Sequence, residues 1–206
     1  MNQAKQPHTH TAFWGFYGAL LLSVGVWQVL YRQGIIILNI NQWHAPWADF
    51  FFRYITHAGD GVFCVALAIL VGFWSKRKGI LLFAAYTVSG LVAQLLKNFA
   101  FPKEPRPVEY FAGMMQNIHT VAGVELSHWN SFPSGHTTSA FAVFGLLAFW
   151  SKSPWQQVGW LLVACVVGYS RMYLFQHFLI DVYAGSFLGI CTAFGLYYFF
   201  NKGQRS

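Results

Sequence analysis

Residues 170–181 read SRMYLFQHFLID and place an arginine, a histidine and an aspartate between two apolar runs of the chain. These runs extend from about residue 155 to 173 and from 178 to 200. Ionisable side chains at or near a bilayer are costly and are usually retained for function. The stretch therefore predicts a polar, functional junction between two helices that cross a membrane.

The composition of the whole chain agrees with a membrane protein. Of the 206 residues, 56% are hydrophobic and 9% are charged, whereas charged residues make up about 25% of a soluble domain. The apolar residues gather into segments that are long enough to cross a bilayer, although the second is short. We predict an all-α, polytopic membrane protein with one domain over residues 1–206. Its six transmembrane helices are expected at 11–31, 61–75, 79–99, 134–150, 155–173 and 178–200.

Two connecting segments have compositions of their own. Residues 32–60 mix Trp and Phe with polar groups, which is typical of a segment lying at the membrane interface. Residues 100–133 form the longest connection and carry apolar residues throughout, so we expect an ordered and functional outer loop. The three cysteines lie in apolar runs without metal-site spacing and are expected to pack there.

The distribution of basic residues predicts the orientation. Lys76–Lys78 and Lys152 lie in two short connections that six crossings place on the same side as both termini. Positive charge favours the cytoplasmic side, so both termini are predicted to be cytoplasmic. All six acidic residues fall on the opposite side, together with six basic residues. Topology thus explains much of the net charge of +7, and no nucleic-acid partner is expected.

A second polar cluster, SFPSGHTTS, occupies residues 131–139 at the start of the fourth predicted helix. Proline disfavours helix at the residue before it. Ser134 is then a natural N-cap, and Gly135 allows the backbone to approach a ligand closely. Such a helix start binds anions through its free amides, with His136 facing the same space. The plainer alternative is an ordinary capped helix whose histidine touches lipid headgroups.

In the opening stretch, His177 and Asp181 are four residues apart and are expected to share one helix face. The carboxylate can accept the imidazole N–H and raise the nucleophilicity of the other nitrogen. Arg171 ends the fifth predicted helix and offers planar donors suited to phosphate. The alternative is an Arg171–Asp181 pair that ties two helices together, with His177 at their interface.

The third cluster, KNFAFPKEPRP at residues 97–107, adds the cations Lys97 and Arg106. Headgroup contact is the alternative for both, and we assign it to Lys103. All three clusters fall on the same side of the predicted topology, so together they predict an anion pocket beside two histidines. A phosphoryl group needs neutralised oxygens, an in-line nucleophile and an acid for the leaving oxygen. These residues supply all three, so neither a metal nor a cofactor is required.

With these motifs in place, the chain resembles the type 2 phosphatidic acid phosphatase (PAP2) superfamily, in its membrane lipid phosphatase branch. The pattern of that family is K-x6-RP, then PSGH, then SR-x5-H-x3-D. The second and third motifs are present at residues 133–136 and 170–181, without gaps. The first departs, because eight residues separate Lys97 from Arg106. By motif, the resemblance covers residues 97–181.

The resemblance implies a role for each matched residue. His177 would be the nucleophile that forms a phosphohistidine, and Asp181 would orient it. His136 would protonate the leaving lipid oxygen and then activate water. The phosphate would be held by Lys97, Arg106, Arg171, the hydroxyl of Ser134 and the amide of Gly135.

The resemblance also implies an activity, a metal-independent lipid phosphatase acting on a phosphomonoester or diphosphate. The lipid classes are isoprenyl diphosphate, phosphatidylglycerol phosphate, phosphatidic acid and lipid A, and the tail would enter sideways between helices. The absence of a glycosylation sequon favours a bacterial inner membrane with a periplasmic site. Two alternatives are a phosphotransferase that uses the same histidine and a non-catalytic lipid-binding protein. A vanadate peroxidase does not fit so apolar a chain.

The other histidines and several tryptophans are expected to have no catalytic role. His8 and His10 lie in a tail that is predicted to be flexible. Four histidines in outer segments are expected to pack at the interface, and two of them flank the site in sequence, where they could touch a headgroup. These four are His44, His57, His119 and His128, the last two being the flanking pair. Trp43, Trp47 and Trp129 are expected to be interface anchors.

Overall fold

The computed structural model describes residues 10–202, in which every regular element is helical and no strand occurs. The long elements are α1 (Thr11–Leu30), α4 (Gly61–Trp74), α5 (Lys76–Leu95), α7 (Gly135–Trp150), α8 (Pro154–Tyr173) and α9 (Leu179–Lys202). The short elements are α2 (Gln33–Gln42), α3 (Pro46–Ile55), η1 (Thr56–Gly59), η2 (Leu96–Ala100), α6 (Pro107–Tyr110) and η3 (Ala112–Asn117).

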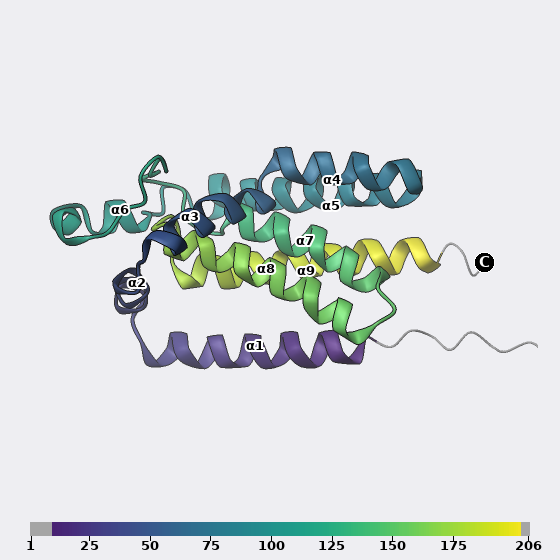
Figure 1. The fold of residues 1–206 in the computed structure, drawn as a ribbon, viewed down its shortest axis with the longest axis horizontal. Helices are drawn as coiled ribbons and strands as arrows, with labels where there is room; N and C mark the ends of the chain where they lie inside the picture. Colours follow the sequence, from purple (N-terminus) through teal and green to yellow (C-terminus); the bar gives the residue numbers. More distant parts are fainter. Residues whose placement is uncertain (1–9, 203–206) are drawn as a thin grey trace, which may run out of the picture.

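The six long helices run side by side along one axis, with α1 on one flank and α4 and α5 on the other (Figure 1). Helix α7 lies between them and packs on α5, α8 and α9. Its four consecutive residues Phe141, Ala142, Val143 and Phe144 are all buried. A helix that is apolar on every side belongs at the centre of a bundle, and α7 forms the core around which the others pack.

Each predicted apolar segment coincides with one long helix, and all boundaries agree within two residues except those of the third segment, whose helix α5 ends at Leu95 and continues into η2. The exception is the third segment, which was predicted to begin at residue 79 and begins instead at Lys76. The hydroxyl of Ser75 accepts a hydrogen bond from the Lys78 amide at 3.4 Å and caps α5. Capping by one serine shortens the expected basic loop to a single residue.

Judged by length and composition, fewer helices qualify as membrane spans than the six predicted. Three helices are long and apolar enough to cross a bilayer: Thr11–Leu30, Lys76–Ala100 and Leu179–Phe200. A fourth candidate is the pair Pro46–Gly59 and Gly61–Trp74, which bends by 60°. Helix α7 has only 16 residues, and Gln156, Gln157 and Arg171 make α8 more polar. Because α7 is enclosed by other helices, it need not present a lipid-facing surface of full length.

The connections sort to the two ends of the bundle (Figure 1). The start of α1, the end of α9, the α4–α5 turn and the α7–α8 turn lie at one end. Helices α2, α3 and α6 lie at the other. The basic turns are therefore separated from the outer segments by the length of the bundle, as the predicted topology requires.

The segment predicted at the membrane interface forms α2, α3 and η1. Along α3, Trp47, Phe50 and Tyr54 are exposed, which suits aromatic contact with headgroups. The long outer loop is ordered against this segment. Its His119 bonds to the Asp49 carboxylate at 2.9 Å, and the Tyr173 hydroxyl donates to the same carboxylate. One partly buried aspartate thus joins the loop to α3 and α8.

Helices α7 and α9 approach each other through glycine. A Cβ atom on Gly189 would lie 2.5 Å from the Thr138 carbonyl oxygen and 2.6 Å from the Phe141 Cβ. Small residues of this kind allow membrane helices to pack with their backbones close together. Elsewhere on α9, a Cβ on Gly195 would meet no atom within 4 Å.

This pair of glycines gives a test of the packing. We expect Gly189→Ala to lower the free energy of unfolding by about 1–3 kcal/mol, because the methyl group forces α7 and α9 apart. Gly195→Ala should be neutral or slightly stabilising, because alanine favours helix. Thermal unfolding of both variants in detergent measures the difference. Equal midpoints for the two variants would contradict the close approach.

Candidate active site

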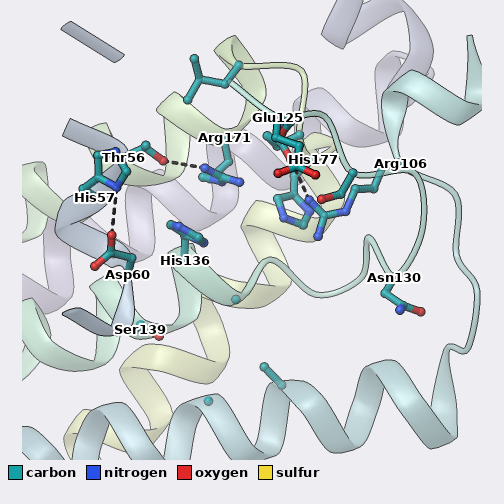
Figure 2. Close-up of a pocket in the computed structure, with 18 of the residues that line it drawn as sticks. Thr56, His57, Asp60, Arg106, Glu125, Asn130, His136, Ser139, Arg171 and His177 are labelled. Atoms are coloured by element: carbon teal, nitrogen blue, oxygen red, sulfur yellow. Dashed lines mark hydrogen bonds and ion pairs between the residues drawn. The ribbon is translucent and has the colours of Figure 1, made fainter. Parts of the chain in front are cut away.

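The three polar clusters meet at one cavity of about 1120 Å³ at the α2–α3 end of the bundle (Figure 2). Segments that lie far apart in the sequence contribute to its wall. Of the residues predicted for the site, six line this cavity: Lys97, Arg106, Gly135, His136, Arg171 and His177. The other two, Ser134 and Asp181, are buried and do not line it; Asp181 contacts both Ser134 and the cavity residue His177.

His177 is placed by a sharp reversal of the chain between α8 and α9. The amides of Gln176 and His177 both donate to the Arg171 carbonyl, at 2.9 and 3.2 Å. This requires Phe175 to adopt a φ of 58°, a left-handed conformation that is strained for a bulky residue. Phe175 is fully buried in an apolar cluster with Ile36, and its packing offsets the strain. His177 is thereby held beside the end of α8 with 2% of its surface exposed.

His177 and Asp181 meet, but not on a shared helix face. Helix α9 begins at Leu179, so His177 precedes it, and the expectation of a common face was wrong. Asp181 lies in the first turn and accepts a hydrogen bond from the Phe178 amide at 2.9 Å. Its Oδ2 atom lies 3.4 Å from His177 Nδ1. This contact is long, and catalytic hydrogen bonds often tighten when substrate binds.

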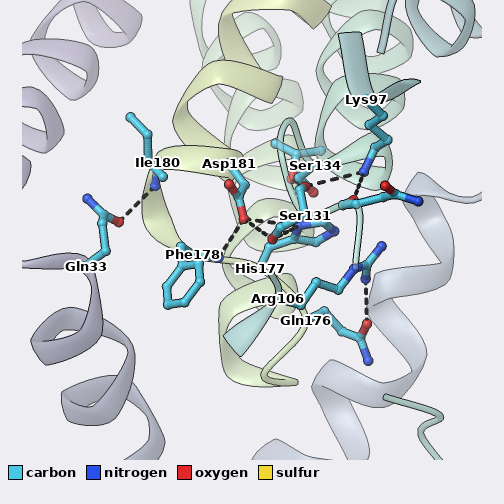
Figure 3. A network of polar contacts seen from close by, with 12 residues as sticks. Gln33, Lys97, Arg106, Ser131, Ser134, Gln176, His177, Phe178, Ile180 and Asp181 are labelled. Carbon is cyan, nitrogen blue, oxygen red and sulfur yellow. Dashed lines mark hydrogen bonds and ion pairs between the residues drawn. The ribbon is translucent and has the colours of Figure 1, made fainter. Parts of the chain in front are cut away.

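Ser131 completes the contacts of the carboxylate, and sequence reasoning gave it no role. Its hydroxyl donates to Asp181 Oδ2 at 2.5 Å and lies 3.4 Å from His177 Nδ1 (Figure 3). Its amide donates to the Glu104 carbonyl. The only signal in the sequence was its position two residues before Pro133, because the contact itself depends on tertiary structure.

Burial lowers the pKa of His177 well below its ordinary value of 6.5, and the positive charges of Arg106, Arg171 and Lys97 lower it further. The imidazole is therefore neutral at physiological pH. Its Nδ1 atom faces Asp181 and Ser131. The Nε2 atom makes no hydrogen bond within residues 10–202, which leaves a neutral ring nitrogen available to attack an electrophile.

Arg171 is a buried cation with unused hydrogen-bonding capacity. One terminal nitrogen donates to Thr56 Oγ1 at 2.7 Å. Its Nε atom is buried and has no partner in the part of the chain that the structure describes. The alternative Arg171–Asp181 ion pair does not occur among those residues. An unpaired buried donor is costly, and an anion in the cavity would satisfy it.

Lys97 and Arg106 line the cavity while holding the segment before α7. Lys97 donates to the carbonyls of Asn130 and Ser131, at 2.5 and 3.3 Å. Arg106 donates through Nε to the Trp129 carbonyl at 3.0 Å and through a terminal nitrogen to Gln176 at 2.8 Å. The longer spacer of the first motif therefore does not prevent Lys97 from reaching the cavity.

The start of α7 departs from the expected cap. Ser134 occupies the N-cap position, but its side chain caps no amide. Its hydroxyl instead accepts a hydrogen bond from Thr137 Oγ1 at 2.9 Å, and its own amide donates to the Asp181 carbonyl at 3.0 Å. Gly135 and His136 reach the cavity, so the first helical turn faces the site while Ser134 anchors it from behind.

The remaining outer histidines fall into two groups. His119 and His128 pair with Asp49 and Glu109 and do not line the cavity, while His44 stacks on His119 with ring centroids 3.9 Å apart. His57 lines the cavity and is also largely exposed. Trp129 also lines it, in addition to being partly exposed.

Of the two N-terminal histidines, His10 lies within the described residues and His8 does not. His10, expected in a flexible tail, lies against the bundle, where its ring packs edge-on against Phe149. His8 lies outside the described residues.

Comparison with known proteins identifies the family of this chain. Residues 78–205 match the PAP2 superfamily. The chain belongs to this superfamily. The matched region contains all three polar clusters and the helices α5, α7, α8 and α9. The resemblance seen in the motifs is therefore confirmed.

Individual relatives agree with membership of the PAP2 superfamily. The chain is 28% identical over 174 residues to phosphatidylglycerophosphatase B of Bacillus subtilis, covering 78% of this chain and 79% of that one. It is 30% identical over 133 residues to the undecaprenyl-diphosphatase BcrC of the same organism, covering 63% of each. The crystal structure of a PAP2-type phosphatidylglycerolphosphate phosphatase from Bacillus subtilis superposes with a TM-score of 0.69. It is 24% identical and covers 95% of this chain and 98% of that one, which shows a common fold.

The contacts of Ser131 predict that it positions Asp181 and thereby His177. A hydrogen bond to a charged group contributes about 1.5–3 kcal/mol, so Ser131→Ala should lower kcat for a lipid phosphomonoester by roughly ten- to a hundredfold. The KM should change little, because Ser131 does not line the cavity. Ser89→Ala, which alters another buried serine outside the cavity wall, is the matched control. A fall in stability without a fall in kcat would contradict this role.

The lowered pKa of His177 also predicts how stability depends on pH. The unfolded chain takes up a proton at this residue near pH 6.5, whereas the folded protein does not. This group therefore leaves the free energy of unfolding unchanged above pH 6.5. Each pH unit below about 6 lowers that free energy by roughly 1.4 kcal/mol. Thermal midpoints from pH 7.5 to 5 should therefore fall more steeply for the wild type than for His177→Asn. Parallel slopes would show that His177 is protonated in the folded state.

Proposed function

We propose that this protein is a membrane-embedded lipid phosphatase that hydrolyses a phosphomonoester or diphosphate through a phosphohistidine. The observation that carries this proposal is that one cavity brings a neutral His177 together with three cations from separate segments. Membership of a superfamily that includes lipid phosphatases supports it. Neither a binding module nor a scaffold requires a buried imidazole paired with a carboxylate beside such a cradle.

The first half of the reaction forms the phosphoenzyme. Lys97, Arg106 and Arg171 neutralise the phosphoryl oxygens. His177 Nε2 attacks phosphorus, an N–P bond forms and the P–O bond to the lipid breaks. Asp181 accepts the Nδ1 hydrogen bond and stabilises the charge that develops on the ring. The negative charge of the bound phosphate favours protonation of His136, which then donates this proton to the leaving lipid oxygen.

The second half releases inorganic phosphate. His136, now neutral, takes a proton from a water molecule that attacks phosphorus. The N–P bond breaks, and His177 returns to its neutral state. The amide of Gly135 adds a donor from the helix start. The hydroxyl of Ser134 can reach the phosphate only after it leaves Thr137, so that part of the cradle assembles with substrate bound.

The proposed membrane arrangement has six crossings, with both termini in the cytoplasm and the site on the periplasmic side of a bacterial inner membrane. The separation of the basic turns from the site supports it. The cavity wall also continues along α5 through Tyr86, Gly90 and Leu91, beside Gly61 of α4. This extension gives a lipid tail a sideways path along the face of α5, so the substrate need not leave the bilayer.

The substrate classes follow the relatives. Phosphatidylglycerol phosphate and undecaprenyl diphosphate are suggested by the names of proteins similar to this chain. Phosphatidic acid and lipid A phosphates share the phosphomonoester chemistry. All four combine an apolar tail with a phosphate that the cationic end of the cavity can hold.

The mechanism predicts that His177→Ala abolishes phosphate release from lipid phosphates in detergent while the protein remains folded. Vanadate should inhibit the wild type, because it mimics the transferring phosphoryl group. EDTA should not inhibit, and the lack of any group of three potential metal ligands within residues 10–202 supports this expectation. With p-nitrophenyl phosphate, whose leaving group needs no proton donor, His136→Ala should accumulate an acid-labile phosphoenzyme that His177→Ala cannot form.

The assay includes a control and separates the competing activities. His44→Ala changes an outer histidine that does not line the cavity and should retain activity. Reactions are run with and without a second lipid as acceptor. Transfer of labelled phosphate to that lipid instead of water would indicate a phosphotransferase. Phosphate release that survives His177→Ala would overturn the mechanism.

A further inference from the structure

A second histidine–aspartate pair lines the catalytic cavity outside all three motifs. His57 Nδ1 lies 2.9 Å from Asp60 Oδ2, and both residues belong to the cavity wall. Neither residue has a part in the reaction proposed above. An ion-pairing group in the substrate cavity that the chemistry does not use is a candidate for substrate selection.

The carboxylate of Asp60 is fixed and ionised. Its Oδ1 atom accepts a hydrogen bond from the Phe63 amide at 2.9 Å and caps α4, while Oδ2 contacts His57. Burial alone would raise the pKa of Asp60, but the hydrogen bonds from Phe63 and His57 and the nearby histidines lower it overall. The cavity therefore carries a permanent negative charge at this point.

The η1 turn sets where this charge lies. Thr56 accepts a hydrogen bond from Arg171, and Gly59 packs so closely on α7 that a Cβ would lie 2.5 Å from the His136 carbonyl oxygen. In Figure 2, Asp60 and His57 lie on one side of His136, and His177 and Arg106 lie on the other. The proposed proton donor thus separates the second pair from the phosphoryl cradle.

This position faces the leaving group. If His136 protonates the leaving oxygen, the groups beyond it contact the part of the substrate that is bonded to that oxygen. The cavity continues from Asp60 and Gly61 to Tyr86 and Gly90 of α5, which is the path proposed for the lipid tail. The part of the substrate between the scissile phosphate and the tail must therefore pass Asp60.

The two ends of the cavity have opposite charge. Lys97, Arg106 and Arg171 lie around the phosphoryl end (Figures 2 and 3), whereas Asp60 lies at the leaving-group end. Arg53, also in the wall, donates to the Ala122 carbonyl of the outer loop. Glu125 lies beside His177 at the phosphoryl end (Figure 2), where the three cations outnumber its carboxylate. Like charges at close range repel each other. The second phosphate of a lipid diphosphate would lie next to Asp60.

We propose that Asp60, held by His57, selects phosphomonoester lipids over lipid diphosphates. This selectivity rests on the proposed phosphatase function and narrows its substrate class. A monoester places an uncharged carbon chain or glycerol beside Asp60, so only a diphosphate meets the carboxylate with a second charge. Asp60 acts on the leaving group through charge and takes no part in bond making or breaking.

The test compares farnesyl phosphate with farnesyl diphosphate, two lipids with the same tail. The purified full chain in detergent is assayed for kcat/KM from initial phosphate release. We expect the wild type to favour the monophosphate at least tenfold, and Asp60→Asn to lower that preference at least fivefold. Asparagine caps a helix as well as aspartate does, so α4 should be preserved. Asp60→Ser, another good cap, is the second variant if Asn lowers the thermal midpoint.

Glu109→Gln is the matched control, because Glu109 forms a similar pair with His128 at 2.8 Å but lies outside the cavity wall. Its substrate preference should equal that of the wild type. Equal or faster hydrolysis of the diphosphate by the wild type, or an unchanged preference in folded Asp60 variants, overturns the selectivity alone. If the wild type releases phosphate from neither lipid, the proposed function fails and the selectivity fails with it.

Discussion

The close packing of α7 against α9 is the constraint on which the site depends. The Ser134 amide donates to the Asp181 carbonyl, and a Cβ on Gly185 would lie 2.8 Å from the Ser134 carbonyl oxygen. These contacts bring the first turns of two helices together, with His136 in the first turn of α7 and His177 directly before α9. Any larger residue at Gly185 or Gly189 would separate the helices, and the histidines would move apart with them.

Around this junction the protein concentrates positive charge that its own carboxylates do not neutralise. Asp181 is occupied by Ser131 and Phe178, and the described residues contain no ion pair between a carboxylate and Lys97, Arg106 or Arg171. The cations instead bond to carbonyls, an amide and a hydroxyl, which hold them in place but leave their charge intact. The apolar packing of the bundle stabilises this arrangement, and a doubly charged phosphoryl group complements it.

Much of the fold could be predicted from the sequence, because a helix that packs on apolar neighbours leaves a continuous apolar run. The ends of α4, α8 and α9 follow from the places where such runs stop. The start of α5 could not be predicted, because one serine cap outweighed three basic residues. The number of crossings is likewise not determined by runs alone, because a helix enclosed by others, such as α7, is not selected for lipid contact along its whole length.

For the site, the residue types and their order could be read from the sequence alone, because the motifs are local and the chemistry of phosphate limits the choice. How these residues meet depends on the packing of the helices. Phe175 keeps its left-handed conformation while packed in a cluster with Ile36, Ser131 contacts Asp181, and His57 and Asp60 enter the cavity. Each of these depends on segments that lie far apart in the sequence. Such contacts depend on distances in space, and spacing along one chain does not record them.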